Sequence, residues 1–177
     1  MSRVVSDAGP LIHLAQIDKL HLLKMLFSQV VITPGVKREA HDMGVKHGYA
    51  DAEIIGKAIE EGWIIVEKPS KHLVIASRKL AKQENISLVD AETILLAKEN
   101  KAEVLVDERV LSNLARLMGL RVWNTWTVLL ESLNQGCIEV ADIEAAIKQL
   151  AEKKHKLKPE HANHILTAAR NIARGKG

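Results

Sequence analysis

The sequence predicts a three-layer α/β/α fold built on a parallel sheet. Short apolar runs such as Val4-Val5 and Val30-Val31-Ile32 recur along the chain, and stretches with helical spacing separate them. The separating stretches are long enough for right-handed crossovers, which favour a parallel sheet covered by helices on both faces. With 177 residues, 47% of them hydrophobic and 27% charged, the chain can form one globular domain with a sizeable core.

Five strands are expected, in chain order, at residues 3–6, 29–33, 63–67, 103–107 and 120–123. Between the first two strands, leucine spacing indicates two short helices broken near Ile17-Asp18, and Pro34 can open the next helix. Further helices are expected at residues 51–61, 71–84, 91–100, 110–118, 125–135, 139–152 and 159–173. Pro69 interrupts the chain before 71–84, so residues 68–89 are interpreted as a lid or an insertion.

The composition indicates whether the protein crosses a membrane, is secreted or contains disulfides. The longest apolar runs are too short to cross a membrane, and the first residues lack the pattern of a secretory signal, so we expect a cytoplasmic protein without membrane contact. Cys137 is the only cysteine, which excludes an intramolecular disulfide and a cysteine metal cage.

The net charge of +3 is unevenly distributed, because residues 153–177 hold seven Lys/Arg and one acidic residue. A basic segment suits a polyanionic substrate, and a solvated terminal helix is the alternative.

Acidic residues recur where the predicted strands end or where the neighbouring helices begin. The carboxyl ends of parallel strands and the first turns of the following helices face one crevice, where ligands bind. Oxygen ligands suit Mg²⁺ and Mn²⁺, and clustered carboxylates without metal should raise at least one carboxyl pKa. The six candidate ligands are Asp7, Glu39, Asp90, Glu92, Asp107 and Glu108.

Each of these acids also has a purely structural explanation. Asp7 precedes Gly9-Pro10 and could be a turn or cap residue, and Glu39 could be a solvated helix residue. Asp90 could cap a helix whose first turn carries Glu92, and Asp107 or Glu108 could cap the helix that follows. Acidic residues stand at four of the expected positions, and a purely structural explanation at all four together is less common than at one of them.

The sequence resembles PIN-domain proteins over about residues 3 to 135, and more narrowly a poorly characterised prokaryotic branch of that family. The motifs that carry the resemblance are VVSDAGPLIHLAQIDKLHLLKMLF, VVITPGVKREA, LVDAETILLAKENKAEVLVDERVLSNLARLMGL and VWNTWTVLL. The resemblance implies a five-stranded parallel sheet of order 3-2-1-4-5 and a metal-dependent ribonuclease. We therefore expect a nuclease domain at 1–136, and the helical pattern and basic charge after Gly136 predict a helical, basic extension at 137–177. Many such proteins are VapC-type toxins paired with a small antitoxin, and a homodimer is common among them.

The resemblance also implies roles for individual residues. The expected catalytic acids are Asp7, Glu39, Glu92 and Asp107, with Asp90 as an alternative to Glu92 and Glu108 as an alternative to Asp107. A Thr-x-Asp pattern that many family members carry at the last acidic position is absent here. Mg²⁺ or Mn²⁺ would activate a water for in-line attack on phosphorus, so no protein nucleophile is required. Contacts to RNA phosphates are expected from Lys37, Arg38, Arg109, Asn124 and Thr125.

Two functions therefore compete on the sequence alone. The first is a metal-dependent endoribonuclease that cleaves RNA, and the second is a PIN-like nucleic-acid-binding or interaction module that has lost catalysis. The missing Thr-x-Asp pattern favours the second slightly. Phosphatases of the haloacid-dehalogenase type are excluded because Ala8-Gly9 follows Asp7 where they need Asp-x-Asp. A dinucleotide-binding domain is excluded because no G-x-G-x-x-G follows the first strand.

Overall fold

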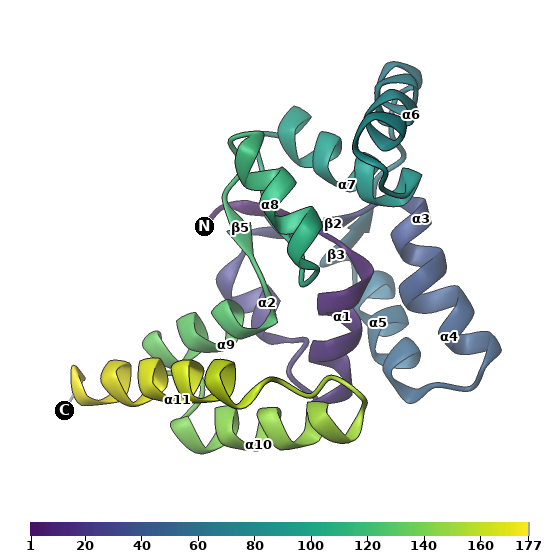
Figure 1. Ribbon diagram of the computed structural model, residues 1–177. Coiled ribbons are helices and arrows are strands. Elements are labelled where there is room, and N and C mark those ends of the chain that lie inside the picture. The colour runs from purple at the N-terminus through teal and green to yellow at the C-terminus, as the bar shows by residue number, and fades with distance from the viewer. Residues whose placement is uncertain (177) are drawn as a thin grey trace.

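The computed structural model describes residues 1–176 and contains one five-stranded parallel sheet (Figure 1). The strand order β3-β2-β1-β4-β5 confirms the expected order 3-2-1-4-5. All four neighbouring pairs run parallel, with Val4 opposite Val30 in one central pair and opposite Glu103 in the other. The strands are β1 (Arg3–Ser6), β2 (Gln29–Ile32), β3 (Ile64–Val66), β4 (Glu103–Leu105) and β5 (Val122–Trp123).

Neighbouring residues on each central strand point into different cores. Val4 and Val30 belong to one hydrophobic cluster, whereas Val5 and Val31 belong to the other. Side chains alternate across a strand, so a strand that is buried on both faces must be apolar at successive positions. This requirement explains why the runs in the sequence are continuous rather than alternating.

Helices cover both faces of the sheet. The cluster around Val4 receives buried side chains from α1 (Ala8–Gln16), α2 (Leu22–Leu26), α3 (Pro34–Lys37), the π-helical turn η1 (Arg38–Asp42), α5 (Ala50–Glu60) and α9 (Thr125–Asn134). The cluster around Val5 receives them from α6 (Lys71–Glu84), α7 (Leu88–Glu99) and α8 (Arg109–Leu117). One further short helix, α4 (Met43–Lys46), continues η1.

Three expected boundaries were wrong by a few residues. The fourth strand stops at Leu105 instead of residue 107, because the neighbouring β5 has only two residues and the chain enters α8 at Arg109. The fifth strand begins at Val122 instead of residue 120, because the Leu120 N–H bonds the Ala115 carbonyl at the end of α8. Helix α7 begins at Leu88 instead of residue 91, so its N-cap is Ser87 and not Asp90.

Residues 68–89, interpreted from the sequence as a lid or an insertion, contain helix α6, its two connections and the first two residues of α7. Ser70 caps α6 through a hydrogen bond from the Leu73 N–H, and Asn85 ends it in the left-handed conformation. Leu73 and Ser77 are buried against α7. The rest of α6 projects away from the sheet (Figure 1).

The carboxyl-terminal extension forms two helices, α10 (Val140–Glu152) and α11 (Pro159–Arg174), that lie side by side next to α9 (Figure 1). Ile143, Leu150 and Ala169 are fully buried in the cluster around Val4. The apolar stripe of α10 therefore packs on the domain itself. No helix within residues 1–176 is long and apolar enough to pass through a bilayer.

Candidate active site

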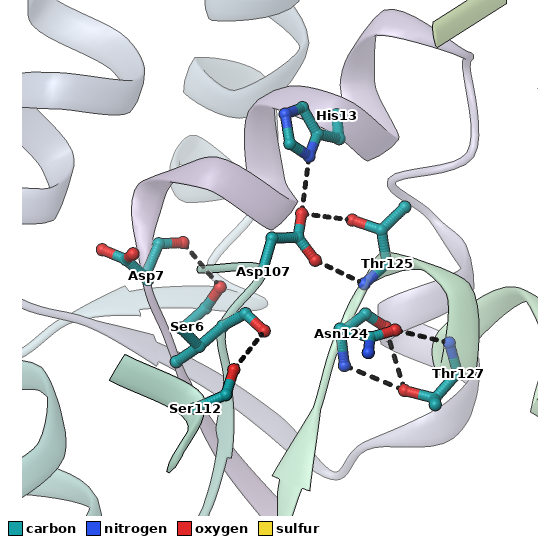
Figure 2. A network of polar contacts seen from close by, with 9 residues as sticks. Ser6, Asp7, His13, Asp107, Ser112, Asn124, Thr125 and Thr127 are labelled. Atoms are coloured by element: carbon teal, nitrogen blue, oxygen red, sulfur yellow. Dashed lines mark hydrogen bonds and ion pairs between the residues drawn. The ribbon is translucent and has the colours of Figure 1, made fainter. Parts of the chain in front are cut away.

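Asp7 stands at the carboxyl end of the central strand. Its backbone N–H bonds the Leu105 carbonyl at 2.9 Å, which ties the end of β1 to β4. Asp7 is the N-cap residue of α1, but its carboxylate forms no capping hydrogen bond with the helix and points away from Asp107 (Figure 2). The side chain is thus free to act at the edge of the sheet.

Four carboxylates influence one another at this edge, and we call Asp7, Glu39, Asp90 and Glu108 the acidic cluster. The pKa of Asp7 is raised to about 7, chiefly by burial and then by the negative charges of Asp90, Glu39 and Glu108, against a lowering hydrogen bond from the Ala8 N–H. Burial, and then the charge of Asp90, also raises the pKa of Glu39, while Arg38 lowers it. The rise expected from clustered carboxylates is therefore present.

Close packing of two helices brings Glu39 and Asp90 together. Gly35 in α3 faces Val89 in α7, and a Cβ at Gly35 would lie 2.7 Å from Val89 Cγ2. Only glycine permits this approach without displacing the valine. Glu39 follows Gly35 by one helical turn, and Asp90 follows Val89, and both carboxylates lie near enough to Asp7 for their charges to raise its pKa.

Glu92 lies beside arginines. Two positions along a helix turn a side chain by more than half a revolution, so Asp90 and Glu92 cannot share a face. Burial raises the pKa of Glu92, and the charges of Arg38 and Arg78 lower it. Sequence comparison with the family favoured Glu92 over Asp90, whereas the structure brings Asp90 near Asp7 and Glu39. The Ser87-x-x-Asp90 capping spacing was the signal that could have fixed the helix phase.

Asp107 uses both carboxylate oxygens to join α1 and α9. Its Oδ1 accepts the Thr125 N–H at 2.7 Å, and its Oδ2 accepts the Thr125 hydroxyl at 2.6 Å. His13 Nδ1 lies 2.5 Å from the same Oδ2 (Figure 2). Asp107 thus faces away from the acidic cluster, whereas Glu108, the next residue, contributes to the charge around Asp7.

His13 is a site residue that sequence reasoning missed. It lies on α1 within the apolar stretch Leu11-Ile12-His13-Leu14, and a polar residue in such a stretch was the available signal. Its ring contacts that of His155, with centroids 3.8 Å apart and planes at 61°. Burial lowers the pKa of His155, and a positive charge on His13 lowers it further, against the raising effect of Asp107.

Of the five residues expected to contact phosphates, three are engaged in contacts within the protein and two are not. Asn124 caps α9, accepting the Thr127 N–H at 2.9 Å, and Thr125 is held by Asp107. Lys37 pairs with Asp42 at 3.5 Å. Arg38 and Arg109 are exposed and form no ion pair with any residue of the described chain, so of these five residues they are the two cations free to bind a ligand.

The acidic cluster fits a divalent cation by the chemistry of its donors. All four side chains offer carboxylate oxygens, which Mg²⁺ and Mn²⁺ prefer, and a cation would relieve the repulsion that raises the pKa of Asp7. Across residues 1–176, no three His, Cys, Asp or Glu side chains already stand together as metal ligands.

A family model described as a PIN domain matches residues 3–171 of this chain. The chain belongs to the PIN-domain family. The match runs past residue 135, where the resemblance seen in the sequence ended, and includes most of α11. No curated protein matches the chain. The PIN domain is a nuclease fold, which supports a nuclease or another nucleic-acid-related function for this chain.

Three solved structures resemble this PIN domain. PAE2754 from Pyrobaculum aerophilum is 16% identical with a TM-score of 0.58, over 73% of this chain and 94% of that one. A PilT N-terminus domain protein, SSO1118, from the archaeon Sulfolobus solfataricus is 20% identical with a TM-score of 0.48, over 74% and 93%. A domain of a protein of unknown function from Methanocaldococcus jannaschii is 18% identical with a TM-score of 0.43, over 70% and 91%. At these identities, the likeness to PAE2754 shows a shared fold.

Proposed function

We propose that this PIN domain is a Mg²⁺- or Mn²⁺-dependent endoribonuclease that hydrolyses phosphodiester bonds in RNA. The observation that carries the proposal is the acidic cluster at the carboxyl edge of the sheet. Burial and three neighbouring carboxylates raise the pKa of Asp7 to about 7. A structure gains nothing by holding such mutually repelling groups together unless a cation joins them, and perturbed carboxyl groups concentrate at functional sites.

Each residue of the site has a role in this proposal. Asp7, Glu39, Asp90 and Glu108 would hold the cation, and deprotonated Asp7 would be the central ligand. When bound, the cation supplies positive charge that draws in the phosphodiester and stabilises the negative charge developing on its oxygens. Arg109 and Arg38 are free to bind neighbouring phosphates. Asp107 fixes Thr125 and His13 and so holds the edge of the sheet in place.

The finer parts of the proposal concern partners. We propose that the protein acts in the cytoplasm as the toxin of a toxin–antitoxin pair, with a small antitoxin as its partner. We also propose that it forms a homodimer. Exposed apolar side chains support a protein contact on α8, where Val110 is 59% and Leu117 is 86% exposed. Large apolar side chains that lie seven positions apart on one helix present a single face to a partner.

An inactive nucleic-acid-binding module is the second candidate. Two observations favour it: within the described part of the chain no three acidic or histidine side chains are already arranged as ligands, and Asp107 is committed to Thr125 and His13. This candidate retains RNA binding and predicts no cleavage with any metal.

The deciding experiment is cleavage of a mixed pool of structured and single-stranded RNA with Mn²⁺, Mg²⁺ or EDTA. We expect cleavage that requires metal and falls by at least a hundredfold in Asp7→Asn, because the central ligand is lost. Glu108→Gln should weaken Mn²⁺ binding in calorimetry as well. Glu60→Gln, which changes an exposed acid on α5, is the matched control and should cleave like the wild type.

Circular dichroism of Asp7→Asn must show an intact fold for the comparison to count. Wild-type cleavage by Asp7→Asn would remove the catalytic assignment. RNA binding without cleavage under every metal condition, with no carboxylate-dependent Mn²⁺ binding, would establish the inactive module instead.

A further inference from the structure

A pocket of about 450 Å³ opens beside the acidic cluster and is not used by the proposed chemistry. Helix α1, the η1–α4 segment, the start of α5 and the end of α10 line it. Glu39 stands at its rim, so the pocket and the acidic cluster share a residue. A second hollow of about 400 Å³ shares Gln16, Tyr49, Asp51 and Lys153 with it, so the two form one groove.

The floor of this groove offers hydrogen-bond acceptors. Gln16 Oε1 is buried and accepts no hydrogen bond from residues 1–176. Leaving a buried acceptor without a donor is unfavourable, so this oxygen can accept a hydrogen bond from a group bound in the pocket. The carboxylate of Asp51 is a second acceptor in the same groove and forms no ion pair with the described residues.

An aromatic side chain lies at the mouth of the groove. Tyr49 is 58% exposed, and its ring lies 5.7 Å from that of His47, with the planes tilted by 31°. An exposed tyrosine beside a second ring is a surface on which a planar base can stack. Nothing in the core requires an aromatic residue at this position, because the Tyr49 ring contributes to neither hydrophobic cluster.

A strap of lysines crosses the same edge of the molecule. The connection between α10 and α11 carries Lys153, Lys154, Lys156 and Lys158, which are all exposed and form no ion pair within the described chain. Lys153 and Lys154 line the groove at Glu39, and Lys156 lines another pocket at Asp107 and Asn124. The contact between His155 and His13 holds the middle of the strap against α1.

These observations suggest that the groove suits the base of a nucleotide and that the lysine strap suits its phosphates. Three acids, Glu39, Asp51 and Glu152, outnumber the two lysines of the strap that line the groove, so it disfavours a phosphate. A neutral base edge with amino groups could donate to Asp51 and Gln16. Phosphates on either side would meet the lysine strap, whose charges are unpaired. The groove is therefore a base site and the strap is a backbone site.

We propose that this groove binds one unpaired base of single-stranded RNA next to the phosphate at the acidic cluster, with Tyr49 stacking on the base. Gln16 and Asp51 accept hydrogen bonds from the base, which favours cytosine over uracil because cytosine carries an exocyclic amino group where uracil carries a carbonyl. Lys153, Lys154 and Lys156 bind the flanking phosphates. The inference rests on the proposed function, since it names the substrate contact of the same site.

Tyr49 is the only tyrosine in the chain, which gives a selective probe. Fluorotyrosine-labelled protein has one fluorine NMR signal, and it reports on the mouth of this groove alone. Binding is followed in EDTA, so that no metal-dependent cleavage can occur, with single-stranded oligo(C), oligo(U), an RNA duplex and inorganic polyphosphate. We expect oligo(C) to shift the signal, polyphosphate and duplex to leave it in place, and oligo(U) to bind about tenfold more weakly than oligo(C).

Variants separate the base site from the backbone site. Tyr49→Ala should weaken oligo(C) binding about tenfold and Tyr49→Trp should restore it, because stacking needs only an aromatic face. Gln16→Leu should remove the preference for oligo(C) over oligo(U). Lys153→Ala should weaken both oligonucleotides equally and reduce the salt dependence, whereas Lys98→Ala, an exposed lysine on α7, is the matched control.

The outcomes distinguish this proposal from the nuclease proposal. A shifted Tyr49 signal in a protein that never cleaves RNA would keep the base site and remove the nuclease. Metal- and Asp7-dependent cleavage without any shift, or with unchanged affinity in Tyr49→Ala, would keep the nuclease and overturn the base site. A signal that ignores RNA but moves with an acidic peptide would also overturn it and make the groove a protein-binding site.

Discussion

Asp7 shows how one carboxyl group responds to its surroundings. In the folded chain its pKa is about 7, and burial is the largest cause, followed among the raising effects by Asp90, Glu39 and Glu108. An unfolded chain exposes Asp7 to water, where an aspartate ionises near pH 4. The folded state therefore holds a proton more tightly than the unfolded state over the interval between these two values.

That difference makes stability depend on pH in a definite direction. Below about pH 4, Asp7 is protonated in both states; between about pH 4 and 7 the unfolded state releases the proton first, so the free energy of unfolding falls as pH rises. We expect Asp7→Asn to raise the free energy of unfolding by about 1–3 kcal/mol at pH 8 in EDTA, and by little near pH 4. Thermal melts of both proteins across this pH range check it.

Two outcomes decide this prediction. Equal melting temperatures for the wild type and Asp7→Asn at pH 8 would show that Asp7 ionises without penalty. Saturating Mn²⁺ should stabilise the wild type more than the variant, because the cation binds the ionised cluster of the folded state.

Pairs of nearby acidic residues show that a sequence can locate a site without showing which acid of the pair points into it. The family resemblance placed Asp107 among the catalytic acids with Glu108 as its alternative, and neither spacing nor residue type separates the two. The structure turns Asp107 toward Thr125, which is 1% exposed, and leaves Glu108 near Asp7. The same holds for Asp90 and Glu92, whose faces depend on where α7 begins.

At the scale of elements, the approach of α3 to α7 positions half of the acidic cluster. Gly35→Ala places a methyl group 2.7 Å from Val89 Cγ2, and valine is stiff about χ1, so the helices must separate. We expect a loss of about 1–3 kcal/mol in stability and weaker Mn²⁺ binding, because Glu39 and Asp90 move apart. Calorimetric Mn²⁺ titration and thermal melts measure the two effects.

A compensating change tests whether the helix spacing is the cause. Gly35→Ala combined with Val89→Ala removes the crowding, so Mn²⁺ affinity should return toward the wild-type value even where some stability stays lost. Val89→Ala alone should bind Mn²⁺ normally. If the double variant binds as weakly as Gly35→Ala, helix separation does not explain the loss.

The whole molecule depends on its carboxyl-terminal helices. Ile143, Leu150 and Ala169 fill the same hydrophobic cluster as Leu129 of α9. We expect a chain ending at residue 136 to lose cooperative thermal unfolding and to bind a hydrophobic dye, because removing α10 and α11 exposes that cluster. Circular dichroism melts and dye fluorescence measure this.

The truncation removes both buried apolar side chains and basic charge, so a control must separate the two effects. Lys156→Ala with Lys158→Ala keeps both helices while removing basic charge, and it should unfold cooperatively near the wild-type temperature. A stable, cooperative truncated chain would support the division at residue 136 that the sequence suggested, and would make the extension an independent attachment.

The sequence by itself determined the class of fold, the strand order implied by the family resemblance, and the edge of the sheet where acidic residues gather. Apolar runs and helical spacing are local properties, and parallel strands deliver their carboxyl ends to one edge by topology alone. Which acids meet there was decided by tertiary structure, because helix phase and helix packing turn Asp90 and Glu108 toward Asp7. His13, Gln16 and Tyr49 acquire their significance only through distant partners, since the end of α10 and the connection after it reach them from more than a hundred residues away in the chain.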